Sequence, residues 1–189
     1  MKTNRLEAFS DGVLAIIITI MVLELKVPEE TDFHSLVPKL PVFLSYLISF
    51  IYIGIYWNNH HHLFQITEKV NGKILWANLH LLFWLSLIPF TTSWIGENHQ
   101  AAAPVTLYGI VLLMSGIAYF ILQRAILKSH GKNFALHQVI GKDLKGKLSV
   151  LIYLVGIGIS FYSSWAAIAC YILVAIIWFI PDSRIEKNA

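Results

Sequence analysis

The chain has 189 residues, of which 57% are hydrophobic and only 13% are charged. Soluble globular domains carry about 25% charged residues, so this composition excludes an ordinary soluble domain. The mean hydropathy is +0.65, and the charged residues cluster between long uncharged runs. A membrane-spanning helix needs about 20 apolar residues, and the uncharged runs 40–59, 74–96 and 100–123 reach that length. The single cysteine, Cys170, allows no disulfide within the chain. The sequence predicts an all-α integral membrane protein.

The first apolar segment is the shortest, because only twelve uncharged residues separate Asp11 from Glu24. A secretory signal peptide is the alternative for this segment. Its basic region would not carry Glu7 and Asp11, however, and no small-residue cleavage site follows Glu24. We therefore predict a first membrane helix over residues 4–26, with polar ends that protein or water shelters.

Five further helices follow in chain order, and Pro89 predicts a kink inside the span 74–94. The uncharged run 148–181 is too long for one span and is interrupted near 161–165, so it predicts two helices. No internal repeat or soluble domain is present, and residues 133–148 suggest a short amphipathic helix at the membrane surface. We expect one six-helix domain over residues 1–189. The predicted spans are 4–26, 40–63, 74–94, 103–127, 147–161 and 164–181.

The basic residues predict the orientation, because cytoplasmic loops of membrane proteins are enriched in lysine and arginine. Six spans place 12 of the 14 basic residues on one side, and only Lys26 and Lys39 on the other. The 12 are Lys2, Arg5, Lys69, Lys73, Arg124, Lys128, Lys132, Lys142, Lys145, Lys147, Arg184 and Lys187. We therefore expect a multi-pass protein of the cell membrane with both termini in the cytoplasm. Basic loops beside spans are ordinary topology signals, so no nucleic-acid partner is predicted.

The first helix has an unusual distribution of side chains. Ionisable groups bracket its apolar middle: Arg5, Glu7, Asp11 and Glu24. Between them, Ile16, Ile20 and Leu23 follow the i, i+4, i+7 spacing of one helical stripe, and Thr19 flanks it. Such a stripe can pack against other helices. It can also line a water path, which rings of aliphatic side chains from several subunits gate by dewetting.

Histidines supply the other polar groups at membrane depth. His60, His61 and His62 are consecutive, so about 100° separates each from the next around a helix and the three cannot converge on one metal ion. We predict no metal site, and expect His60 to face the bundle. His80 needs a hydrogen-bond partner in its span. Asp11 or Ser10 is the expected partner, and Asn78 or a backbone carbonyl the alternative. Since histidine titrates near neutral pH, this network could make opening pH-dependent.

Three motifs carry a family resemblance. They are Arg5-x-x-x-Phe9-Ser10-Asp11 at the start of the first span, Trp57-x-x-His60-x-x-Leu63-Phe64-Gln65 in the second, and Pro89-Phe90-Thr91 in the third. In this order, and on a six-span chain, they resemble the endosomal and lysosomal potassium channel family, transmembrane protein 175, and its prokaryotic homologues. The motifs cover about the first 95 residues.

The resemblance implies a potassium-permeable cation channel in which single-repeat chains assemble as homotetramers and the first helix lines a central pore. By the family's pattern, Ile16 forms the constriction, Ile20 and Leu23 form further hydrophobic rings, and Thr19 contributes to selectivity. The signature would tie this helix to its neighbours through Arg5, Phe9, Ser10, Asp11, Trp57, His60 and His80. The sequence has no Thr-Val-Gly-Tyr-Gly loop, so selection of potassium over sodium would rest on the cost of dehydration and be modest.

The resemblance implies potassium as the permeant ion, with other monovalent cations or protons as candidates, and no cofactor. Other copies of the chain and the bilayer are its partners. The alternative is a proton-coupled secondary transporter that uses Asp11, His60 and His80 as a relay, although the chain lacks the expected inverted repeat. Since spans two to six contain no aspartate or glutamate to support the histidines, we do not expect an enzyme. Passive ohmic current would distinguish a channel from a carrier.

Overall fold

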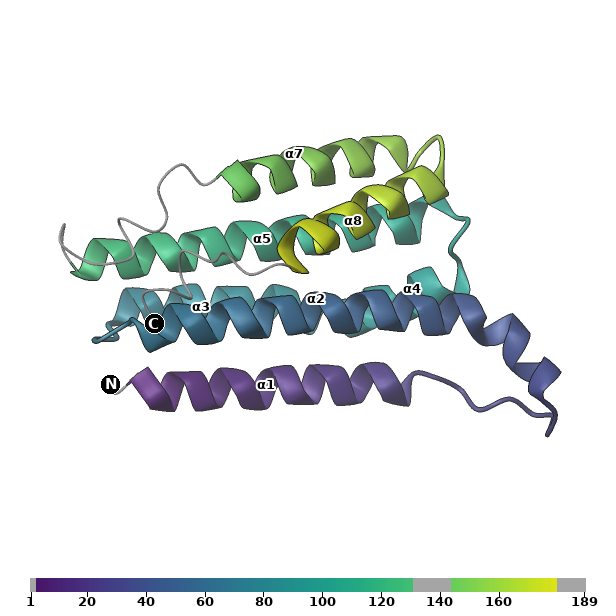
Figure 1. Cartoon of the computed structure of the whole chain (residues 1–189), viewed down its shortest axis with the longest axis horizontal. Helices are drawn as coiled ribbons and strands as arrows, with labels where there is room; N and C mark the ends of the chain where they lie inside the picture. The colour runs from purple at the N-terminus through teal and green to yellow at the C-terminus, as the bar shows by residue number, and fades with distance from the viewer. Residues whose placement is uncertain (1–2, 131–143, 180–189) are drawn as a thin grey trace.

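The computed structural model describes residues 3–130 and 144–179, and the regular elements in these two ranges are all helical. The predicted all-α class is therefore confirmed. In chain order the elements are α1 (Thr3–Leu23), the 3-10 helix η1 (Phe33–Lys39), α2 (Leu40–Gln65), α3 (Gly72–Ser86), α4 (Ile88–Glu97), α5 (Ala102–His130), α7 (Leu144–Ile159) and α8 (Ser164–Phe179). The helices run back and forth along one axis, with α3 and α4 sharing one pass (Figure 1). This arrangement is consistent with six spans.

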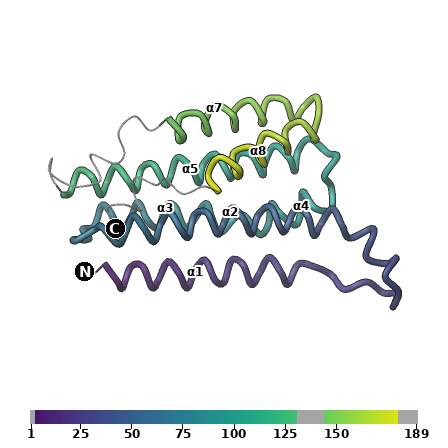
Figure 2. The backbone as a smooth tube through the Cα atoms, viewed as in Figure 1, coloured from purple at the N-terminus to yellow at the C-terminus, as the bar shows by residue number. Residues whose placement is uncertain are grey.

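Helix α1 lies at one edge of the bundle, where it contacts α2, α3 and α4 (Figure 1). Helix α5 packs in the middle against α3, α4, α7 and α8. The antiparallel pair α7 and α8 covers the side of the bundle far from α1 (Figure 2). One face of α1 is consequently packed, and its opposite face meets no other helix of the described chain.

The break between α3 and α4 occurs at Leu87, two residues before Pro89. Proline has no backbone N–H to donate and its ring crowds the preceding turn, so the kink lies where the sequence predicts it. Helix α3 begins at a local cap, in which the Asn71 side chain accepts a hydrogen bond from the backbone N–H of Ile74 at 3.1 Å. This cap sets the residue at which α3 begins.

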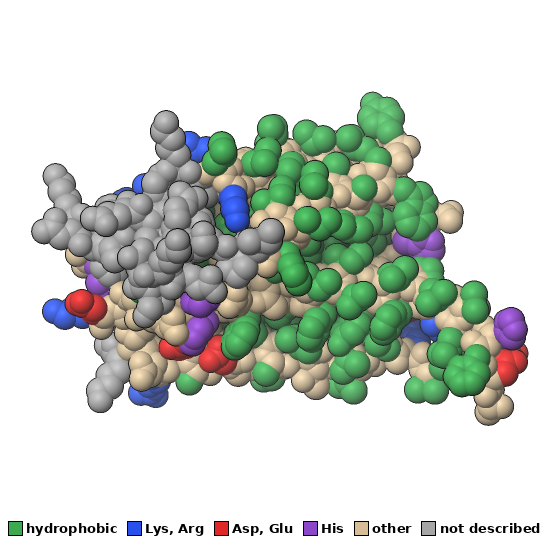
Figure 3. Space-filling view, viewed as in Figure 1, with side chains coloured by type: hydrophobic (Ala, Val, Ile, Leu, Met, Phe, Trp, Pro, Cys, Tyr) green, Lys and Arg blue, Asp and Glu red, His purple; other side chains and the backbone are tan. Residues whose placement is uncertain are grey.

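Four helical stretches of the described ranges are long and apolar enough to cross a membrane. They are Thr3–Leu23, Phe33–Gln65, Gly72–Glu97 and Ala102–His130. Helices α7 and α8 have 16 residues each, about 24 Å of helix, against about 30 Å of hydrocarbon core. On the face that Figure 3 shows, hydrophobic side chains cover the middle of the bundle, and charged and histidine side chains lie toward its two ends. The chain is thus a multi-pass membrane protein.

Each predicted span overlaps a helix of the structure, and 74–94 overlaps both α3 and α4. The first helix ends at Leu23, three residues before the predicted end. The amphipathic helix predicted at 133–148 lies outside the described residues up to 143, and residues 144–148 begin α7. The last residues of the sixth predicted span, 180–181, also lie outside. So do five of the basic residues used for orientation: Lys2, Lys132, Lys142, Arg184 and Lys187.

Candidate functional site

Helix α1 has one packed face and one open face. The packed face carries Leu6, Ser10, Leu14, Ile17 and Met21, all buried against the bundle. The open face carries the stripe that the sequence predicts, with Ile16 61%, Ile20 43% and Leu23 75% exposed. Phe9 and Thr19 are also exposed, and the Thr19 hydroxyl donates to the backbone carbonyl of Ala15 at 2.8 Å. The stripe therefore does not pack against any helix of its own described chain.

A buried chain of hydrogen bonds ties the packed face of α1 to α3 and α2. The Ser10 hydroxyl donates to the Leu6 carbonyl at 2.9 Å and accepts a bond from the Asn78 side-chain amide at 2.9 Å. The Asn78 Oδ1 atom in turn lies 2.8 Å from Nε2 of His60. All three side chains are almost fully buried, and His60 faces the bundle as expected. This chain fixes the rotation of α1 about its own axis, because Ser10 must point inward.

A second set of contacts anchors α1 to α2 closer to the surface. The Trp57 indole N–H donates to Oδ1 of Asp11 at 3.1 Å. One turn further along α2, Nδ1 of His61 lies 2.7 Å from Oε1 of Glu7. The imidazole ring of His61 stacks on the indole ring of Trp57. Consecutive histidines of α2 thus hold α1 from two directions, since His60 reaches it through α3 and His61 contacts it directly. Among the described residues, no group of three or more His, Cys, Asp or Glu could hold a metal ion.

Three residues expected in the network lie outside it, and one of them, Phe9, is exposed on the open face of α1. His80 accepts a hydrogen bond from the Trp84 indole N–H at 2.9 Å, within its own helix. The prediction of Ser10 or Asp11 as its partner is wrong, because two residues of a helix are about 200° apart and Asn78 already faces α1. Arg5 is exposed and forms no ion pair with Asp11 within the part of the chain that the structure describes.

A shallow groove of about 520 Å³ lies at the opposite end of α1, between this helix and α4. Two carboxylates line it. The Glu24 carboxylate accepts a hydrogen bond from the Ser93 hydroxyl at 3.3 Å. Glu97 pairs with Lys26 at 3.1 Å, and both of these side chains are at least half exposed. The groove continues the open face of α1 past Ile20, so acidic groups lie where the apolar stripe ends.

Asn78, Glu7 and His61 belong to the network although the sequence did not predict them as members. Asn78 did carry a signal, because an amide inside an apolar span must find hydrogen-bond partners. The Glu7–His61 pair had a weaker signal, since membrane depth and not spacing along the chain brings the two together.

Comparisons with known proteins agree with this architecture. The sequence model of the family described as "Endosomal/lysosomal potassium channel TMEM175" matches residues 5–89. A protein of Chryseobacterium sp. (strain P1-3), named a potassium channel, is 61% identical over 188 residues, which cover 100% of this chain and 98% of that protein.

A solved structure and an animal relative extend the likeness. The crystal structure of a "lysosomal potassium-selective channel TMEM175 homolog" from Chamaesiphon minutus superposes with a TM-score of 0.81 at 30% identity, covering 93% of this chain and 95% of that one. The "Endosomal/lysosomal proton channel TMEM175" of Danio rerio is 26% identical over 195 residues, which cover 95% of this chain but 36% of that protein. The chain therefore belongs to the TMEM175 channel family, as one of its prokaryotic members.

Proposed function

We propose that this protein is a passive, potassium-permeable cation channel whose pore is lined by the α1 helices of four identical chains. Ile16 forms the constriction, and Ile20 and Leu23 form further apolar rings. The names of the bacterial relatives support potassium as the permeant ion. Passive conduction requires neither a cofactor nor an enzymatic step.

The observation that carries this proposal is the open face of α1. Ile16, Ile20 and Leu23 are exposed, while the opposite face of the same helix is packed and hydrogen-bonded at Ser10 and Asn78. The hydrogen bonds between Asn78 and Ser10 and between Asn78 and His60 hold α1 in one rotation. Since the rotation is fixed, the same side chains point outward in every copy. Symmetric assembly of four chains around this face would surround a narrow apolar path.

An apolar ring discriminates between ions through dehydration. Sodium holds its water more tightly than potassium, so potassium passes at lower cost and the selectivity is modest. The exposed Thr19 lies one turn past Ile16 and offers a hydroxyl oxygen to a partly dehydrated ion. Glu24 and Glu97 at the groove would raise the local cation concentration before the constriction.

The positive-inside rule supports a cytoplasmic N-terminus in the cell membrane. In the described ranges, the basic residues at the N-terminal end of the bundle outnumber Lys26 and Lys39 at the other end. These residues are Arg5, Lys69, Lys73, Arg124, Lys128, Lys145 and Lys147. The acidic groove would then face the outside.

Proton movement is the second candidate, and the buried His60–Asn78–Ser10 chain favours it, because one ring nitrogen of His60 has no partner among the described residues. The animal relative named a proton channel is consistent with it. A reversal potential that follows an imposed pH gradient, and not the potassium gradient, would select this function.

The accessibility of introduced cysteines to a reagent in water tests directly whether α1 lines the pore. In a Cys170→Ser background, Leu23→Cys is expected to lose most of its current on treatment with a charged methanethiosulfonate reagent. Leu151→Cys is the matched control, because Leu151 is also exposed but lies on α7, far from α1. Equal inhibition of both variants, or inhibition of neither, would contradict the proposal. Mass measurement of the detergent-solubilised protein should give four chains.

A further inference from the structure

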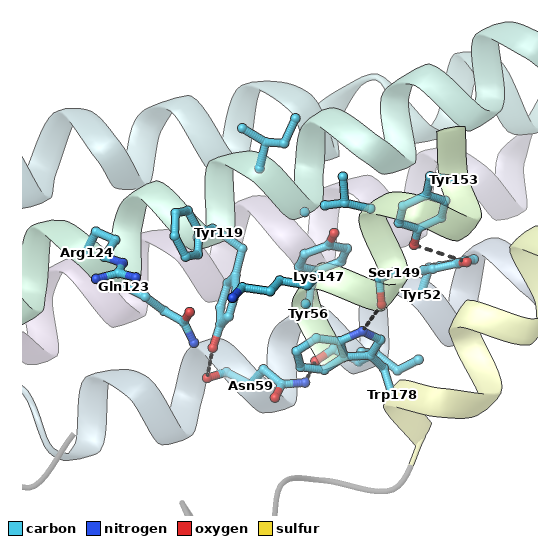
Figure 4. A pocket seen from close by; sticks show the side chains of 16 residues that line it. Tyr52, Tyr56, Asn59, Tyr119, Gln123, Arg124, Lys147, Ser149, Tyr153 and Trp178 are labelled. Atoms are coloured by element: carbon cyan, nitrogen blue, oxygen red, sulfur yellow. Dashed lines mark hydrogen bonds between the residues drawn. The ribbon is translucent and has the colours of Figure 1, made fainter. Parts of the chain in front are cut away.

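A cavity of about 500 Å³ lies between α2, α5, α7 and α8 (Figure 4). This volume falls in the usual range of small-molecule pockets, about 300–1,000 Å³. None of its lining residues belongs to the open face of α1 or to the hydrogen bonds that anchor this helix. The cavity therefore has no part in the proposed pore.

One end of the cavity is positively charged. Arg124 on α5 and Lys147 on α7 both line it, and none of its described lining residues carries a carboxylate. The Arg124 guanidinium lies 4.9 Å from the centroid of the Phe120 ring, which holds it at this end. Figure 4 shows the Lys147 side chain extended across the cavity toward Tyr119. Both cations stand at the end of the bundle where the α1 N-terminus lies.

Two polar side chains of the cavity have no side-chain hydrogen bond among the described residues. The Tyr56 hydroxyl and the Gln123 amide line the cavity, and neither forms a side-chain hydrogen bond within residues 3–130 and 144–179. Uncharged polar groups in an apolar site are stabilised when a ligand or water supplies the missing bond. Gln123, the chain neighbour of Arg124, can therefore add a donor to the two cations for the oxygen atoms of one ligand.

The other end of the cavity is apolar. Tyr52 and Tyr153 close it, and the Tyr153 hydroxyl donates to that of Tyr52 at 3.2 Å. Tyr52 in turn donates to the backbone carbonyl of Tyr171, so these hydroxyls are occupied and the rings face the cavity. On the wall, the Trp178 indole N–H is likewise bound to the Ser149 hydroxyl at 2.8 Å. The lining of the cavity is thus cationic at one end and aromatic at the other.

We infer that this cavity binds one acyl chain of an anionic membrane phospholipid, whose phosphate lies between Arg124 and Lys147. The positive charge of the two basic side chains complements the phosphate. The aromatic end of the cavity complements the hydrocarbon of the acyl chain. Its position at the membrane surface end of α5 matches the level of a headgroup, in the leaflet on the side of the α1 N-terminus. Basic residues near a membrane surface each strengthen binding of anionic lipid about fivefold.

The experiment is native mass spectrometry of the purified, delipidated full chain, titrated with phosphatidylglycerol or with phosphatidylcholine of the same acyl chains. The parent protein should retain phosphatidylglycerol more tightly. The double variant Arg124→Gln, Lys147→Gln should bind it about 25-fold more weakly, with phosphatidylcholine unchanged. Lys73→Gln removes a basic residue from the same end of the bundle outside the cavity, and should change neither.

A second variant tests the acyl-chain part of the cavity. Gly116 lines it, and a Cβ atom there would approach only the Tyr56 hydroxyl, at 3.8 Å, so the side chain of Gly116→Leu starts from an open position and occupies cavity volume. Gly116→Leu should weaken the binding of both lipids. Gly158→Leu, at an open glycine of α7 outside the cavity, should weaken the binding of neither lipid. The inference is overturned if the parent shows no preference for phosphatidylglycerol, if the double variant keeps that preference, or if Gly116→Leu binds both lipids normally. Displacement of phosphatidylglycerol by soluble glycerol phosphate would also overturn it, since the acyl chain would then be dispensable.

Discussion

The Asn78 side chain is the central buried link between α1 and the rest of the bundle, so Asn78→Leu should weaken the attachment of this helix. The substitution keeps the approximate volume but removes two buried hydrogen bonds, of 2.9 Å to Ser10 and 2.8 Å to His60. Hydrogen bonds between membrane helices contribute about 0.6 kcal/mol each. A buried polar group left without a partner costs about 1–3 kcal/mol more, and the other ring nitrogen of His60 is already unpartnered. We therefore expect Asn78→Leu to lower the free energy of unfolding by about 2–4 kcal/mol.

The assay is thermal unfolding of the purified protein in detergent. A loss of this size should lower Tm by about 4–16 °C for a chain of this length. Asn58→Leu is the matched control, because Asn58 lies on α2, is only half-buried, and forms no side-chain hydrogen bond within the described ranges. If Asn78→Leu lowers Tm no more than Asn58→Leu does, the buried chain does not hold α1 and the argument for its fixed rotation fails.

Three further changes test other contacts. Gly156→Ala would place a Cβ atom 2.7 Å from the Tyr171 ring, so it should lower the free energy of unfolding by about 1–3 kcal/mol, measured by thermal unfolding. Gly54→Ala is the control and should not lower it, because a Cβ atom there meets nothing within 4 Å. Equal effects of the two substitutions would refute the tight packing at Gly156. Trp57→Phe keeps an aromatic ring but removes the 3.1 Å hydrogen bond to Asp11 on α1. We expect it to lower the free energy of unfolding by about 0.5–1.5 kcal/mol, and an unchanged Tm would show that this hydrogen bond is dispensable. Glu24→Gln should reduce potassium current at about 10 mM salt but not at 1 M, whereas an equal reduction at both would rule out an electrostatic role.

Periodicity and proline made much of the fold predictable. The i, i+4, i+7 stripe of Ile16, Ile20 and Leu23 needs only the helical repeat, and these residues are exposed together on one face. The kink near Pro89 follows from a missing N–H group, and the helix breaks at Leu87. Both inferences depend on the local chain alone, so they did not require knowledge of how the helices pack.

Contacts between helices were harder to predict, because they depend on relative depth and rotation. Ser10 and Asn78 are 68 residues apart, and the packing of α1 against α3 sets the height at which they meet. His80 is only two residues from Asn78, yet it points away from α1 because a helix turns by about 200° over two residues. A composition argument favours His80, the more strongly polar side chain, but rotation decides in favour of Asn78.

The proposed pore is tested most directly by current through the purified protein in a planar bilayer under opposed potassium and sodium gradients, with the parent chain compared to Ile16→Asn. Because Ile16 is 61% exposed in the single chain, its replacement should leave the fold intact. The account predicts passive current in the parent with a potassium-favouring reversal potential. In Ile16→Asn it predicts a larger conductance and a reversal potential shifted toward zero. Unchanged currents in the variant would remove Ile16 from the constriction, and the absence of passive current in both folded proteins would contradict the channel itself.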